Sequence, residues 1–148
     1  MTGPLLVLSL DRTIAAAMAV RAEGGLAADH PSLAAARLVR VLAPSARLEI
    51  WTSRRESQRE AIGRALEDVG IAPTLLGRAR GDGDRRGPTA LRRGFLVESD
   101  IRPEGVFEDD AALACFWLAQ RIAVFHFLQP VAVPALREVR PRLVAASA

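Results

Sequence analysis

Hydroxyl and carboxylate side chains gather in three short stretches of this chain, each directly after an apolar run. Their polar members are Ser9, Asp11, Thr52, Ser53, Asp109 and Asp110. Hydroxyls and backbone N–H groups can bind phosphate oxygens, whereas carboxylates can hold Mg²⁺ or transfer protons. This combination of residue types predicts chemistry on a phosphate group, provided that the fold brings the three stretches together.

The elements that must do this are five apolar runs, each of the kind that forms a strand buried on both faces. We expect strands over residues 5–10, 46–52, 73–77, 104–109 and 122–127. Amphipathic segments between the runs predict helices. Strands that alternate with helices indicate a three-layer, Rossmann-like α/β fold with an open parallel sheet of about five strands.

One of the predicted helices carries its own boundary signals. It spans residues 53–70, with Ser53 as a candidate N-cap, Glu56 three residues later and Gly70 as its stop. The acidic pair Asp109 and Asp110 would begin the helix after the fourth strand, where negative charge favours the helix dipole.

In an open parallel sheet, ligands bind beyond the carboxyl ends of the strands. The first strand ends in Ser9-Leu10-Asp11, the second in Thr52-Ser53, and the fourth in the acidic pair, so all three should meet at this edge. Because side chains alternate along a strand, Ser9 and Asp11 should point to the same side. The convergence predicts one polar site.

The motifs resemble those of the haloacid dehalogenase-like (HAD) superfamily, most closely the compact phosphatase domain of polynucleotide kinase-phosphatases. The family's first motif, DxDxT, corresponds to Ser9-Leu10-Asp11-Arg12-Thr13, and its second to Thr52-Ser53-Arg54. The third, a Lys or Arg on a helix, corresponds to Arg92 or Arg93, and the fourth to Asp109 and Asp110. The resemblance spans roughly residues 4–127 and is broken at the first motif.

By this resemblance, Ser9 occupies the position of the nucleophile and Asp11 that of the general acid and base. Thr52, Ser53 and Arg92 would bind phosphate. The metal ligands implied for Mg²⁺ are Asp11, Asp109 and Asp110.

Ser9 changes the chemistry that such a site can perform. An aspartyl phosphate is readily hydrolysed, whereas a phosphoserine is a stable monoester. Asp11 lies about 6.5 Å further along the strand, which is too far to attack in its place. We therefore expect a degenerate phosphatase domain that keeps a phosphate site and weak Mg²⁺ binding, with little or no phosphatase activity.

Two alternatives remain open at this stage. One is an active Mg²⁺-dependent phosphohydrolase, acting on nucleic-acid ends or other phosphomonoesters, in which Asp11 activates a metal-bound water. The other is a non-catalytic interaction or assembly module. The inserts beside the site are too short for a cap domain, so the open site predicts a phosphorylated macromolecule, either a nucleic-acid end or a protein, as its partner.

Composition sets the remaining expectations. The chain has 148 residues and a net charge of +3, and it contains Arg but no Lys. We expect an α/β domain over residues 1–128 and a Pro-containing tail over 129–148 that packs on the domain or docks a partner. No apolar run is long enough to span a membrane, which predicts a cytoplasmic protein. Cys115 is expected in the core, and the Arg-rich segment 78–93 is either a solvated loop or a phosphate-facing rim.

Overall fold

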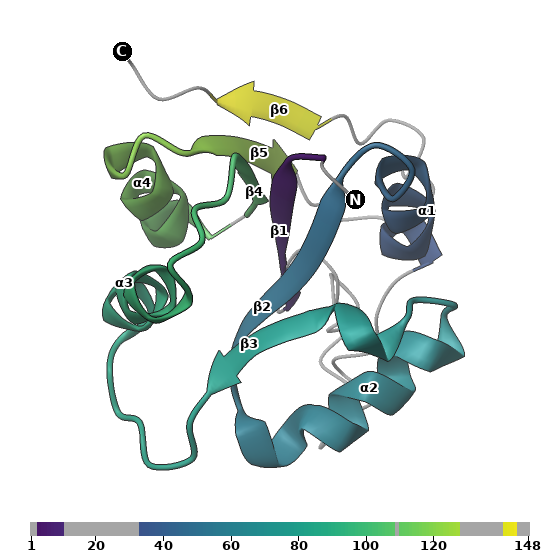
Figure 1. Ribbon diagram of the computed structural model, residues 1–148, viewed down its shortest axis with the longest axis horizontal. Coiled ribbons are helices and arrows are strands. Elements are labelled where there is room, and N and C mark those ends of the chain that lie inside the picture. Colours follow the sequence, from purple (N-terminus) through teal and green to yellow (C-terminus); the bar gives the residue numbers. More distant parts are fainter. Residues whose placement is uncertain (1–2, 11–32, 109, 128–140, 145–148) are drawn as a thin grey trace.

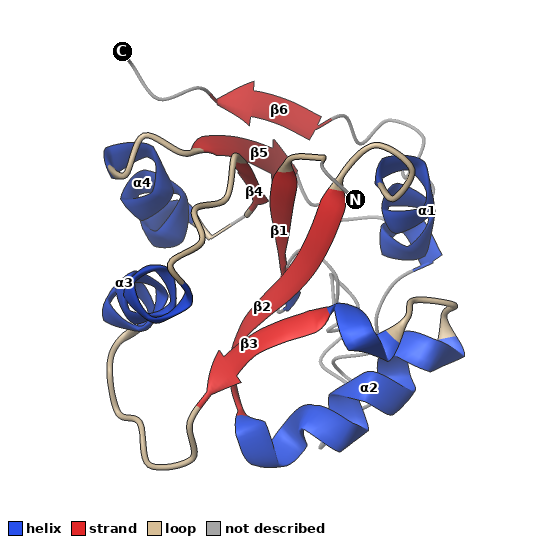
Figure 2. Cartoon of the chain, in the orientation of Figure 1, coloured by secondary structure: helices blue, strands red, loops and turns tan. Residues whose placement is uncertain are grey.

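The computed structural model describes residues 3–10, 33–108, 110–127 and 141–144, which form a sheet with helices on both faces (Figure 1). The strands are β1 (Leu5–Ser9), β2 (Arg47–Arg55), β3 (Leu76–Arg80), β4 (Gly105–Phe107), β5 (Ala123–Phe127) and β6 (Pro141–Val144). The helices are α1 (Leu33–Leu42), α2 (Arg59–Asp68), α3 (Pro88–Ser99) and α4 (Ala111–Ala119), shown in blue in Figure 2.

The strand order is β3-β2-β1-β4-β5-β6. Neighbouring strands from β3 to β5 are parallel, and β6 pairs antiparallel with β5 at one edge. The predicted open, three-layer α/β fold with a five-stranded parallel sheet is therefore confirmed, with one antiparallel strand added. The segment 11–32, where we expected no cap domain, lies outside the described residues.

The sheet separates two hydrophobic cores, because successive side chains of each buried strand point to opposite faces. Helices α1 and α2 cover one face and α3 and α4 the other (Figure 1). The core beneath α1 and α2 includes Leu8, Ile50, Ile62, Leu66 and Phe107. The core beneath α3 and α4 includes Val7, Trp51, Phe95, Val106 and Trp117.

The observed bounds differ most from those predicted around β2, α2 and β3. Pro73–Leu75 forms a 3-10 turn, and β3 begins only at Leu76, because Pro73 has no N–H to give to a strand ladder. Strand β2 continues to Arg55 and a second 3-10 turn precedes α2, so Ser53 lies in a strand and the prediction that it caps a helix is wrong. Gly70, with φ at +81°, follows the end of α2 as expected.

The tail contributes the edge strand β6, which pairs residue by residue with β5. The rest of the predicted tail, residues 129–140 and 145–148, lies outside the described part of the chain.

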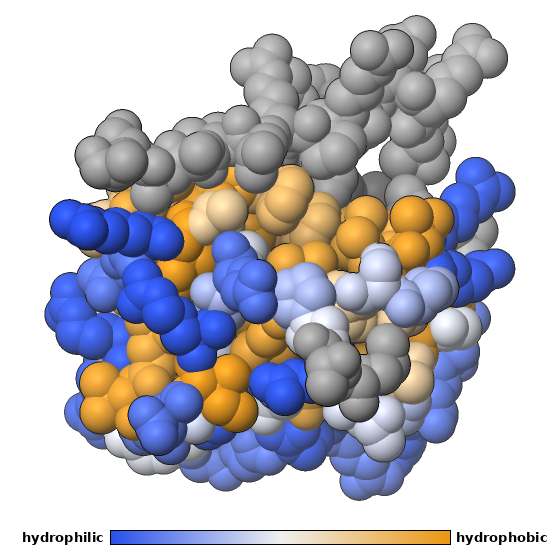
Figure 3. Space-filling view, turned by 45° about the horizontal axis from the view of Figure 1, so that its top comes forward, coloured by the Kyte–Doolittle hydropathy of each residue, from blue (hydrophilic) through white to orange (hydrophobic). Residues whose placement is uncertain are grey.

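The surface mixes polar and apolar residues (Figure 3). Of the large hydrophobic side chains in the described ranges, Val41 and Val97 are the exposed ones. Cys115 is exposed on α4, so the prediction that it packs in the core is wrong. No helix among the described residues is both long and apolar enough to cross a membrane.

Candidate phosphate-binding site

Ser9 is the last residue of β1 and lies at the carboxyl edge of the sheet. It pairs in register with Trp51 of β2, and the preceding residue, Leu8, pairs with Phe107 of β4. Val7 belongs to the core beneath α3 and α4, so strand alternation directs Ser9 toward the same two helices. Its side chain is only 4% exposed. A hydroxyl is therefore buried at the centre of the edge where ligands of such sheets bind.

Ser53 and Arg92 meet across this edge although they are far apart in sequence. The Arg92 guanidinium donates from Nη1 to Ser53 Oγ at 3.2 Å and lies 5.4 Å from the centre of the Phe95 ring. Arg92 is only 2% exposed, which is costly for a cation unless polar partners compensate. Arg93, the other candidate for this position, is exposed and packs over Phe116. The structure thus places Arg92, rather than Arg93, beside Ser53.

Thr52 is fully buried between Trp51 and Ser53. Its Oγ1 accepts a hydrogen bond from the Arg54 N–H at 3.0 Å. The pairing of β2 with β3 is irregular between Trp51 and Arg55. Such irregularities redirect side chains and often lie next to functional sites, and here the irregular stretch contains Thr52 and Ser53.

Glu108 is a site residue that the sequence analysis missed. It directly follows β4 and is 1% exposed, and its Oε1 accepts the backbone N–H of Asp110 at 3.1 Å. It alternates with Val106, whose side chain packs beneath α3 and α4, so it faces the same side as Ser9. The signal that could have revealed it is its position: a carboxylate one residue past a fully apolar strand.

Asp110 begins α4 and caps it. Its Oδ1 accepts the Leu113 N–H at 3.0 Å, which satisfies one of the free donors at the start of the helix. The predicted partners Asp11 and Asp109 lie outside the described residues, so two of the three predicted metal ligands have no described position.

Oxygen donors of the kind that Mg²⁺ prefers are present at the end of β4, in Glu108 and Asp110. Within the described ranges, no three carboxylate, histidine or cysteine side chains form a group that could hold a metal ion. The donor chemistry fits Mg²⁺, but each of these two carboxylates already accepts a backbone N–H. The described residues therefore supply two carboxylates toward a site that would need further ligands from water or phosphate.

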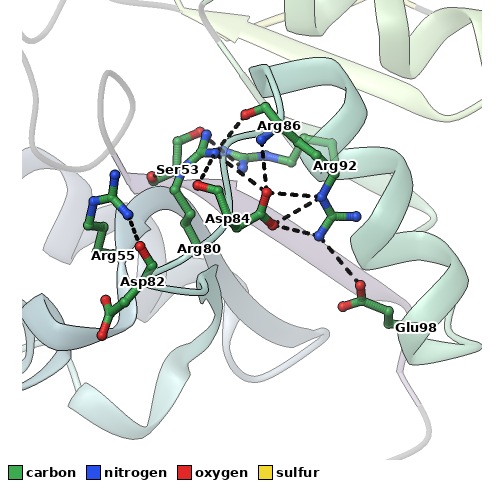
Figure 4. Close-up of polar contacts among 8 residues, drawn as sticks. All are labelled: Ser53, Arg55, Arg80, Asp82, Asp84, Arg86, Arg92 and Glu98. Atoms are coloured by element: carbon green, nitrogen blue, oxygen red, sulfur yellow. Dashed lines mark hydrogen bonds and ion pairs between the residues drawn. The ribbon is translucent and has the colours of Figure 1, made fainter.

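An arginine-rich rim borders the site and consists of residues 81–87, the loop between β3 and α3 (Figure 4). Asp84 accepts hydrogen bonds from the side chain and backbone of Arg86, which lower the pKa of its carboxyl to about 2. Asp82 accepts the backbone N–H of Ser57, and this bond lowers its pKa as well. Both carboxylates therefore stay charged at neutral pH, and the rim is an ordered part of the edge.

Taken together, the fold and this edge define an open α/β domain with a buried polar site at the carboxyl ends of β1, β2 and β4. Comparison with protein-family models gives no match, and comparison with curated protein sequences gives none.

Solved structures, in contrast, include chains of the same fold. One is in the structure described as the Pnkp1/Rnl/Hen1 RNA repair complex, with a TM-score of 0.67 and 15% identity over 85% of this chain. Another, in a structure of the Pnkp1/Rnl/Hen1 complex, gives a TM-score of 0.66 at 14% identity, again over 85% of this chain. This chain spans only 43% and 46% of the length of those two chains. At such low identity the similarity establishes the fold.

Proposed function

We propose that this chain is a degenerate HAD-like phosphatase domain that binds phosphate and has little or no phosphatase activity. The observation that supports this most directly is the contact between Arg92 and Ser53 at the carboxyl edge, the edge at which the buried Ser9 ends β1. A cation and two hydroxyl groups can bind an anion. Residue 9, which corresponds to the family's nucleophile, carries no carboxylate.

The proposed phosphate site combines two kinds of donor, a hydroxyl and a guanidinium. Ser53 Oγ accepts from Arg92, so its own hydroxyl hydrogen is left to donate to an anion. Arg92 supplies a fixed positive charge with several N–H groups in one plane. Both groups would bind phosphate without help from residue 9.

Mg²⁺ binding is part of the proposal. Glu108 and Asp110 would hold the ion, and Asp11 and Asp109 are the further candidates from the sequence. When bound, the ion would neutralise charge on the phosphate oxygens. We expect low affinity, because Ser9 removes the carboxylate that the resemblance places in the first motif.

The proposed ligand is a phosphorylated nucleic-acid end, in preference to a phosphorylated protein segment. Both similar chains belong to structures of the Pnkp1/Rnl/Hen1 complex, one of which is described as an RNA repair complex. The rim adds exposed cations beside the site, Arg85 and Arg86 among them, and clustered cations favour binding to a polyanion.

The experiment that tests the proposal is the change Ser9→Asp. Turnover of aryl phosphates and of 3′-phosphorylated oligonucleotides should be near background in the native protein and rise at least about a hundredfold in S9D, with Mg²⁺ present. The matched control is S9N, which has the shape of S9D without its nucleophile and should stay at background. Asp11→Asn in the S9D background should abolish the gain.

The other outcomes identify the alternatives. Robust native turnover that requires Asp11 and Mg²⁺ would contradict the proposal and establish an active phosphohydrolase that uses metal-bound water. Folded S9D protein that neither turns over substrate nor binds inorganic phosphate would contradict the phosphate site itself and favour an interaction module.

A further inference from the structure

The loop over residues 81–87 connects β3 to α3 and is held to the rest of the molecule on three sides (Figure 4). It joins the strand that ends at Arg80 to the helix that carries Arg92. The loop therefore spans the two elements whose spacing determines the geometry around Arg92.

Arg80 connects this loop to the end of β2. Its Nε donates to the Ser53 carbonyl at 2.9 Å, and its Nη1 donates to the carbonyls of Arg86 at 2.6 Å and Asp84 at 3.3 Å. The side chain is only 13% exposed. One guanidinium thus joins the backbone of a proposed phosphate-binding residue to two points on the 81–87 loop.

On its far side the 81–87 loop is fastened to α3. The carboxylate of Asp84 accepts hydrogen bonds from the backbone N–H and from the guanidinium of Arg86. The Nη2 atom of Arg86 also lies 3.5 Å from Oε1 of Glu98 on α3. The Arg86 guanidinium sits directly over Gly94 of the same helix, where an added Cβ would lie 2.1 Å from Nη1. This close approach requires the absence of a side chain at Gly94.

The third attachment is to the turn after β2. The Asp82 carboxylate accepts the Ser57 N–H at 3.0 Å, and the Asp82 carbonyl accepts a hydrogen bond from the Arg55 side chain. Because Asp82 and Arg80 bond to the same stretch that contains Ser53, the loop connects the end of β2 to α3 by two routes.

We propose that Arg80 is a positioning residue of the phosphate site. It holds Ser53 at a fixed distance from Arg92 through the 81–87 loop, so that both can engage one phosphate group. This inference rests on the proposed function, which assigns Ser53 and Arg92 to phosphate. The residue type matters because a guanidinium can donate in two directions at once, from Nε to Ser53 and from Nη1 to the loop. A lysine ammonium offers a single nitrogen at the end of a flexible chain.

The test compares inorganic phosphate affinity, measured by titration calorimetry on the full chain, between native protein, Arg80→Lys and Arg80→Met. Loss of an outer-shell support in metal sites costs tenfold or more in affinity, and we expect at least about a tenfold loss for R80M by analogy. The phosphate affinity of R80K should lie between those of R80M and the native protein. Arg78→Met is the matched control, because it makes the same change on the same strand, and Arg78 has no described hydrogen bond to the 81–87 loop.

A purely structural role would lower the melting temperature of R80M and leave the phosphate affinity of the folded protein unchanged. If R80M binds phosphate as tightly as the native protein does, the positioning role is overturned and the proposed function stays intact. If R80M does not fold, R80K decides, and native affinity in R80K overturns the inference. Absence of phosphate binding in the native protein overturns both this inference and the proposed function, so the two failures are distinguishable.

Discussion

The two faces of the sheet are built from the same strands but differ at the carboxyl edge. On the face beneath α1 and α2, both Leu8 of β1 and Leu10, which directly follows the strand, are apolar. On the face beneath α3 and α4, Leu5 and Val7 are followed by the hydroxyl of Ser9. The second face also collects Arg92 and Glu108, both almost fully buried.

This difference shows how one sheet can combine a stable core with a polar site. Burial of a charge destabilises a protein unless polar partners surround it. Among the described residues, the first face keeps charged side chains out of its core and stabilises the domain through its apolar side chains, with the buried hydroxyl of Thr52 following Ile50 at its edge. On the second face, apolar side chains occupy the earlier positions of the strands. The polar side chains that could bind an anion lie at the carboxyl ends. Substitutions on the two faces should therefore separate the stability of the domain from its phosphate binding.

The largest effect is expected from Leu8→Ala, beneath α1 and α2. Leu8 is fully buried, and truncation of such a leucine typically lowers the free energy of unfolding by about 2–5 kcal/mol. Phosphate affinity of the folded protein should not change. Urea unfolding and phosphate titration measure the two quantities.

The matched variant is Ser9→Ala, one residue further along and on the other face. It removes one hydroxyl and no packing volume of note, so its effect on the free energy of unfolding should be under about 1 kcal/mol. A loss as large as that of L8A would show that Ser9 belongs to the core rather than to a polar site.

The contrast between the faces also separates what the sequence could predict from what it could not. Buried strands are apolar on both sides, so runs such as residues 5–10 stand out, and the parallel sheet and its carboxyl edge follow from their alternation with helices. Strand β6 lies in a tail with three prolines and forms through pairing with β5. Such pairing depends on tertiary context that local sequence does not contain.

Within the site, sequence motifs pointed to Ser53 and Arg92 but not to the contact between them. That contact depends on how α3 packs across the end of β2, over a separation of 39 residues. Glu108 was missed because the motif that resembles the family's fourth comprises only the acidic pair that follows it. Arg80 was missed because an arginine at the end of an edge strand is usually solvated, and only the path of the 81–87 loop places backbone carbonyls around it.

An effect smaller than that of L8A is expected at the start of α4, on the polar face. Asp110→Ala removes the N-cap bond to Leu113 and should lower the free energy of unfolding by about 1 kcal/mol. Asp110→Asn should keep most of that stability, because asparagine caps helices as well as aspartate does. Calorimetry with Mg²⁺ should nevertheless show weaker binding in both variants if Asp110 is a metal ligand. Unchanged Mg²⁺ binding in D110N would restrict Asp110 to its capping role.

The smallest expected effect is a change of folding stability with pH that comes from Asp84 in the rim. It sharpens the comparison between the faces, because the described core beneath α1 and α2 contains no charged side chain that could cause such a change. Hydrogen bonds from Arg86 lower the pKa of Asp84 from its ordinary value of 3.8 to about 2. A depressed carboxyl pKa stabilises the folded state fully above the ordinary value, and that contribution is lost as the pH falls toward the folded value. The stability difference between native protein and Asp84→Asn should therefore be constant near neutral pH and shrink between about pH 4 and pH 2. Urea midpoints measured in both proteins across this range isolate Asp84, because the other carboxylates titrate in each. A difference that does not change with pH would show that Arg86 holds the loop without help from the charge of Asp84.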